Sequence, residues 1–134
     1  MLRRYWLAAA LSFVLVACSK PLEPQRMYDS ASALTKLTAH VDAAVVYGPS
    51  VEGVSDQALL DKAFEDNPTL KPQLGSQTIH LQRGDKGVVL MLCSADGATS
   101  LLEDLSCTPG MDKHHWRDEP GRSCTFALSP VACH

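Results

Sequence analysis

Long apolar runs are scarce in this 134-residue chain. The longest one, from Tyr5 to Ala17, has 13 residues, whereas a helix that spans a bilayer needs about 20. No second run of that length follows it. We therefore exclude a polytopic membrane protein and interpret the first run as a targeting segment.

An excess of positive charge is also missing. Lys and Arg number 12 against 15 Asp and Glu, and the formal net charge at pH 7 is −3. The basic residues are not clustered along the sequence. Proteins that bind nucleic acid, or that adhere electrostatically to anionic lipid, depend on clustered Lys and Arg. We therefore expect no nucleic-acid partner and no electrostatic attachment to a membrane.

Recognisable catalytic motifs are missing as well. The sequence has no nucleophile elbow, P-loop, H-E-x-x-H or C-x-x-C pattern. Pairs of neighbouring carboxylates such as Glu103 and Asp104 are expected on the solvated surface, because general acid–base catalysis needs carboxyl groups held across a cleft. His40 and His80 are expected on solvent-facing sides of their elements. We predict that the protein is not an enzyme and holds no cofactor.

The N-terminal residues carry the clearest signal in the chain. Arg3 and Arg4 precede the apolar run, which closes on Leu15-Val16-Ala17-Cys18. A basic tip, an apolar stretch and small residues before a cleavage point are typical of a secretory signal. The cysteine at the junction resembles the lipobox of bacterial lipoproteins. The resemblance implies a diacylglycerol on Cys18, cleavage after Ala17, and a further acyl chain, such as palmitate, on the new amine.

This resemblance divides the chain into three parts. Residues 1–17 are the expected signal peptide, residues 18–27 the acylated cysteine with a Pro-containing tether, and residues 28–134 a single globular periplasmic domain. Several acyl chains hold a protein durably on a bilayer. Ser19 favours sorting to the outer membrane, facing the periplasm, since an aspartate there would resemble an inner-membrane retention signal. A plain secretory signal cut near Ala17 is the alternative.

The other four cysteines all lie in the last third of the chain. An even number of cysteines in an oxidising compartment predicts two disulfides, each contributing roughly 2–4 kcal/mol to a small domain. Four cysteines allow three pairings. One joins Cys107 to Cys124 and Cys93 to Cys133, and the sequential pairing joins Cys93 to Cys107 and Cys124 to Cys133. The sequence does not decide between these two.

Apolar periodicity predicts two helices in the first half of the domain. The first begins near Asp29 or Ser30 and ends at Gly48-Pro49, where glycine and proline stop a helix. Its apolar stripe recurs at three- and four-residue steps. The stripe consists of Leu34, Leu37, Val41 and Val45. The second helix runs from Ser55 to Asn67.

The second half is typical of strands. Thr78–Arg83 alternates between apolar and polar residues, and Val88–Leu92 is a continuous apolar run fit for a central strand. Leu101–Cys107 fits either a helix or a strand, and its place after a tight turn favours a strand. Cys124–Leu128 is predicted as the last strand. The expected class is α+β, with two N-terminal helices packed on a small antiparallel β-sheet and stapled by two disulfides.

The segment Asp112–Glu119 concentrates the candidate functional residues. Its adjacent histidines, His114 and His115, are weak candidates for zinc ligands, because neighbours on an extended chain point to opposite sides. We therefore predict no metal site there. Trp116 and Arg117 belong to the residue types that most often anchor protein interfaces, and we expect them to contact a partner.

Together these features predict a non-catalytic, lipid-anchored lipoprotein of the bacterial cell envelope. We expect it to bind another envelope or periplasmic protein in an accessory, assembly, immunity or exclusion role. The alternative is a periplasmic lipoprotein that binds a small ligand or a metal ion around His114–Glu119.

The anchor gives the first testable prediction. Cys18→Ala removes the only sulfur at the cleavage junction, so the variant should carry no lipid and should leave the membrane fraction. Cell fractionation with metabolic labelling by palmitate measures both effects. Ser19→Ala is the matched control and should still be labelled. Labelling and membrane association of Cys18→Ala equal to those of the unaltered chain would refute the lipoprotein interpretation.

Overall fold

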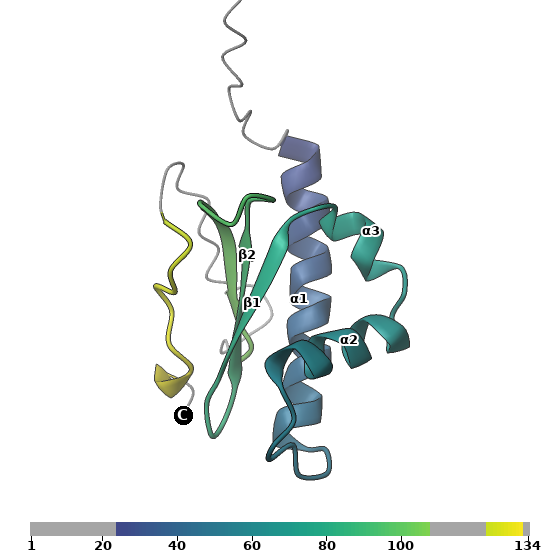
Figure 1. The fold of residues 1–134 in the computed structure, drawn as a ribbon, viewed down its shortest axis with the longest axis vertical. Helices are drawn as coiled ribbons and strands as arrows, with labels where there is room; N and C mark the ends of the chain where they lie inside the picture. Colours follow the sequence, from purple (N-terminus) through teal and green to yellow (C-terminus); the bar gives the residue numbers. More distant parts are fainter. Residues whose placement is uncertain (1–23, 108–122, 133–134) are drawn as a thin grey trace, which may run out of the picture.

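The computed structural model describes residues 24–107 and 123–132 (Figure 1). The helices in these ranges are α1 (Pro24–Val46), α2 (Asp56–Asp66) and α3 (Leu70–Leu74), and a single 3-10 turn, η1, covers Pro130–Ala132. The strands are β1 (Thr78–Arg83), β2 (Val88–Cys93) and β3 (Ser100–Leu105). They form one antiparallel sheet in the order β1-β2-β3. The predicted α+β class is confirmed.

The two long helices lie where periodicity predicted them, with differences at the ends. The apolar stripe of α1 is buried at Leu34, Leu37 and Val41. The helix begins at Pro24 instead of Asp29, because proline fits the first helical position, where the missing N–H needs no partner. The last four residues of the predicted tether 18–27 belong to α1.

Helix α3 was not predicted. Pro72 is tolerated in this short helix because it lies in the first turn, where backbone N–H groups have no helical acceptor in any case. Leu70 and Leu74 are buried and dock α3 on the other helices and the sheet. Among the described residues, no helix combines the length and the hydropathy needed to cross a bilayer.

The start of α2 is tied to the sheet. Ser55 caps the helix, since its side chain accepts a hydrogen bond from the Ala58 amide at 3.1 Å. Arg83, the last residue of β1, reaches back to this cap. Its guanidinium lies 2.8 Å from the carboxylate of Asp56 and donates to the Val54 carbonyl oxygen at 2.9 Å.

Strand β2 is buried along its whole length. Val88, Leu90 and Leu92 pack against the helices, while Val89 belongs to a second apolar cluster with Leu105. Successive side chains of a strand point to opposite sides, so both faces of the sheet are covered. Figure 1 shows the helices on one side and the C-terminal segment, in yellow, on the other. The predicted central strand is confirmed, and Leu101–Cys107 is mainly strand, as favoured.

Two sequence-based expectations for the sheet and its outer cover are wrong. Cys124–Leu128 is not a strand, and the β-pairing described next to it is a single isolated bridge between Thr99 and Ser123. Glu103 and Asp104 are buried in β3 instead of solvated. The Glu103 carboxylate accepts hydrogen bonds from two backbone N–H groups of the C-terminal residues. In a regular sheet, the carbonyl oxygens of a neighbouring strand would accept these bonds.

The disulfide pairing also differs from both favoured arrangements. Cys93 is bonded to Cys124, across 31 residues, with their Cα atoms 5.9 Å apart. Cys107 is not a free thiol either. Cys133 lies outside the described residues, so the second of the two predicted disulfides stays a prediction.

Candidate functional site

The predicted contact residues Trp116 and Arg117 lie outside the described residues, as do the weak metal-ligand candidates His114 and His115 and the predicted lipidation site Cys18. The structure does place the two ends of the segment that carries Trp116. On one side Cys107 packs against the outer cluster of the sheet, and on the other side Ser123 pairs with Thr99. Both ends are therefore attached to the same layer of the domain.

In the part of the chain that the structure describes, residues 123–132 lie on the outer side of the sheet, and we call them the C-terminal segment. The Cys93–Cys124 disulfide attaches its first part to the end of β2. The Cys124 amide also donates to the Ala98 carbonyl oxygen at 3.2 Å. The segment is thus held covalently and by backbone pairing at the turn between β2 and β3.

Glu103 holds the middle of the C-terminal segment. This carboxylate is 1% exposed, and its Oε1 accepts hydrogen bonds from the amides of Ala127 at 2.8 Å and Leu128 at 3.2 Å. Hydrogen bonds to a charged acceptor are stronger than neutral ones, and an unsatisfied buried amide is costly. The Glu103 side chain therefore supplies the hydrogen-bond acceptor that the backbone carbonyl groups of a neighbouring strand would supply in a sheet.

Apolar contacts complete the attachment. Phe126 and Leu128 pack on the pair formed by Val89 and Leu105. At the far end, Pro130 lies against the β1–β2 turn so closely that a Cβ atom on Gly84 would come within 2.7 Å of its Cβ. Glycine is needed there for close approach and not for an unusual backbone angle.

The turn between β2 and β3 is itself fixed by a carboxylate. Ser94 donates its hydroxyl to Asp96, and the Ala98 amide donates to the same oxygen at 3.0 Å. The Ser94 hydroxyl, followed by this amide, lowers the pKa of Asp96. The resulting stabilisation is present above the ordinary carboxyl pKa and is lost as pH falls through the lowered value. This turn carries Ala98 and Thr99, which pair with the C-terminal segment.

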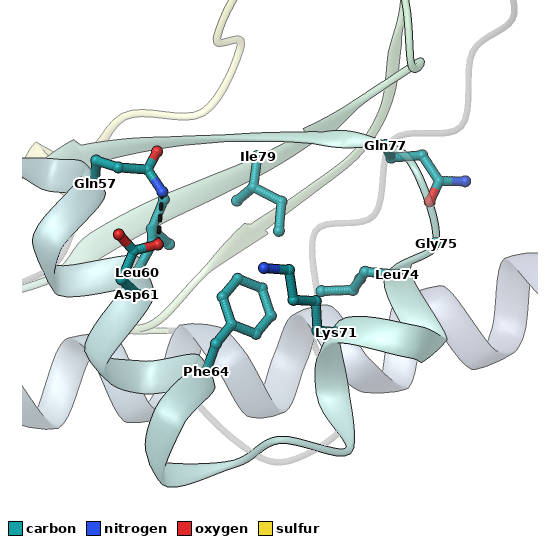
Figure 2. Close-up of a pocket in the computed structure, with 9 residues that line it drawn as sticks. All are labelled: Gln57, Leu60, Asp61, Phe64, Lys71, Leu74, Gly75, Gln77 and Ile79. Atoms are coloured by element: carbon teal, nitrogen blue, oxygen red, sulfur yellow. Dashed lines mark hydrogen bonds between the residues drawn. The ribbon is translucent and has the colours of Figure 1, made fainter.

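A pocket of about 150 Å³ opens on the opposite side, between α2, α3 and β1 (Figure 2). Its apolar walls come from all three elements, and its polar rim combines two amide side chains with one acidic and one basic side chain. The walls are Leu60, Phe64, Leu74 and Ile79. The rim is Gln57, Asp61, Lys71 and Gln77.

The rim is partly organised before any ligand binds. Gln57 donates to Asp61 at 2.8 Å, and the Lys71 ammonium lies 5.8 Å from the centroid of the Phe64 ring, within the range of a cation–π contact. Figure 2 shows the Lys71 amine extending over the pocket toward Phe64 and Ile79. The carbonyl oxygen of the Gln77 side chain is buried, and no residue in the ranges 24–107 and 123–132 donates a hydrogen bond to it. Such an arrangement suits a small molecule with apolar and polar parts.

A second cluster lies beside the disulfide. The side chain of His80, on the outer side of β1, brings a ring nitrogen to within 4.8 Å of the sulfurs of Cys93 and Cys124. Its position follows from the hairpin register, which pairs Thr78 with Cys93 and His80 with Met91. His80 is exposed, as predicted, while Cys93 is fully buried.

Sequence reasoning missed both of these clusters. The pocket draws its residues from three elements, and no local pattern indicates it. The sequence did contain a signal that His80 lies near Cys93. The Gly84–Gly87 turn sets the pairing of Arg83 with Val88. This register puts His80 and Cys93 on the same side of the sheet. No family model, curated protein sequence or solved structure matches this chain.

Attachment through Glu103 gives the second prediction. Glu103→Ala leaves two amides without their acceptor, so we expect a loss of about 1–3 kcal/mol in the free energy of unfolding. Amide hydrogen exchange at Ala127 and Leu128 should accelerate more than exchange in α1. Glu103→Gln keeps a carbonyl oxygen and is the matched control, with a smaller effect. Equal exchange rates at these two amides in Glu103→Ala and in the unaltered chain would contradict the assigned role.

Proposed function

We propose that this chain is a non-catalytic lipoprotein, anchored by acylated Cys18 in the bacterial outer membrane and facing the periplasm. Its domain binds another envelope or periplasmic protein in an accessory, assembly, immunity or exclusion role. The Cys93–Cys124 disulfide is the observation that carries the export part of the proposal, because such bonds persist in oxidising compartments and are rare in the cytosol.

The partner surface is proposed around Trp116 and Arg117. The segment between Cys107 and Ser123 has 15 residues, and both of its neighbours are attached to the sheet. Fixing the two ends of a binding segment reduces the conformational entropy that binding must overcome. Trp and Arg then supply the large, partly polar contact area that dominates many interfaces.

A second candidate function is binding of a small ligand or a metal ion. For a small ligand, the supporting observation is the pocket between α2, α3 and β1, with its apolar walls and the Lys71 and Asp61 charges on its rim. A metal ion would instead bind around His114 and His115, as the sequence alternative holds.

The partner hypothesis gives the third prediction. Photo-crosslinking from positions near Trp116 in the intact cell envelope should capture one reproducible partner, identified by mass spectrometry. Trp116→Ala should weaken that association by about 30-fold, which corresponds to the roughly 2 kcal/mol lost at an interface hot spot.

The control for this experiment is Tyr47→Ala. Tyr47 is the most exposed large hydrophobic residue described, at 83%, and it lies just beyond α1, on the helix side of the domain. Its loss should leave crosslinking unchanged. A chain that stays unlinked and monomeric in its native envelope would overturn the partner proposal.

The second candidate gives the fourth prediction. If the pocket binds a small ligand, native mass spectrometry of the purified chain should detect a bound compound, and Ile79→Trp should abolish it by filling the pocket. If His114 and His115 bind a metal ion, elemental analysis should find one ion per chain, lost in the His114→Ala and His115→Ala variants. Absence of both species would exclude this candidate.

A further inference from the structure

We propose that Cys93, Cys124 and His80 form a Zn²⁺ site when the disulfide between the two cysteines is reduced. The site differs from the one considered at His114 and His115, and it does not depend on the proposed function. In the oxidised chain the sulfurs are bonded to each other and cannot act as thiolate ligands.

The geometry is close to that of a zinc centre. All three ligand atoms already lie within 4.8 Å of one another. Bond lengths of about 2.3 Å to sulfur and 2.0–2.1 Å to nitrogen, at tetrahedral angles, separate zinc ligands by roughly 3.5–3.8 Å. Opening of the disulfide lengthens the sulfur–sulfur distance toward that value. His80 is exposed, so its side chain can reorient toward the ion without disturbing the core.

The fold keeps the two cysteines together after reduction. Cys93 is fixed in the central strand, where it pairs with both Thr78 and Ser100. Cys124 retains its amide bond to the Ala98 carbonyl oxygen, and the C-terminal segment retains the Glu103 and Phe126 contacts. The two thiols therefore do not separate freely. Because the fold already holds the ligands near one another, Zn²⁺ binding loses little further conformational entropy.

The chemistry is balanced as two steps. A dithiol reductant donates two electrons, its own thiols become a disulfide, and its two protons pass to the sulfurs of Cys93 and Cys124. Zn²⁺ then displaces those two protons and binds both thiolates together with a neutral imidazole nitrogen of His80. The two negative charges cancel the charge of the ion, which suits the fully buried Cys93.

Three protein ligands leave a fourth position, and it lies toward solvent because His80 is exposed. Water fills such a position in other three-ligand zinc sites. The consequence for this domain is that Zn²⁺ replaces the covalent bond as the link between the sheet and the C-terminal segment. The segment then stays attached in both redox states.

The fifth prediction tests this site on the full chain, purified in detergent. After reduction with a metal-free phosphine and removal of excess reagent, the chain should bind one Zn²⁺, measured by competition with a chromophoric chelator. The oxidised chain should bind none through these residues. Replacing Zn²⁺ by Co²⁺ should give a thiolate-to-metal charge-transfer band in the near ultraviolet.

Two pairs of variants separate this site from other thiols. His80→Ala should weaken Zn²⁺ binding at least tenfold, since even loss of a hydrogen bond to a zinc ligand costs about that much. His40→Ala, an exposed histidine on α1, should not weaken it. Reduced Cys93→Ser/Cys124→Ser should lose the charge-transfer band, while Cys107→Ser/Cys133→Ser should keep it.

The proposal is overturned if the reduced chain binds no Zn²⁺, if His80→Ala and His40→Ala bind it equally, or if the oxidised chain binds it equally well. Circular dichroism of each variant checks folding. Should a cysteine variant fail to fold, the histidine comparison in the native-cysteine background still decides the result.

Discussion

The burial of β2 on both faces is the constraint on which the rest of this structure depends. A strand with six buried residues needs cover on two sides, and a chain of this size has few elements to supply it. The helices α1, α2 and α3 cover one side through a continuous apolar cluster. Among the described residues, the other side is covered mainly by the ten residues 123–132, which form no strand.

That irregular cover explains where the polar and covalent links lie. An extended segment without a neighbouring strand leaves its amides unpaired, and buried amides need acceptors. Glu103 provides one for Ala127 and Leu128 from inside β3, and the Cys93–Cys124 bond prevents the segment from detaching. On the helix side, a side-chain link is made by Ser106, which donates to Asp42 of α1 at 2.7 Å and accepts from the Val88 amide at 2.9 Å.

Local signals in the sequence were sufficient to predict the helices and strands. They were not sufficient to predict how the C-terminal segment packs on the sheet. The stripe on α1, the Ser55 cap and the alternation in β1 each depend on residues close together in the chain, and each was predicted correctly. Glu103 was expected in solvent because its acceptor role depends on amides 24 and 25 residues away. The Cys93–Cys124 pairing was missed for the same reason, since it follows from which side of β2 the last segment covers. The pocket at Phe64 and Lys71 also needs three elements to meet.

The cover that β2 needs explains both the structural role of the Cys93–Cys124 disulfide and what happens when the bond is reduced. Because the C-terminal segment has little sheet pairing, its attachment depends on few bonds, and the strongest of them is also the one that thiol chemistry can open. Opening it does not erase the site, since β2 and the Ala98 carbonyl oxygen continue to hold the two cysteines. His80 reaches the same place from the exposed edge of the sheet. The ligand atoms of Cys93, Cys124 and His80 lie within 4.8 Å of one another, and this proximity is the reason for regarding the three residues as one chemical unit.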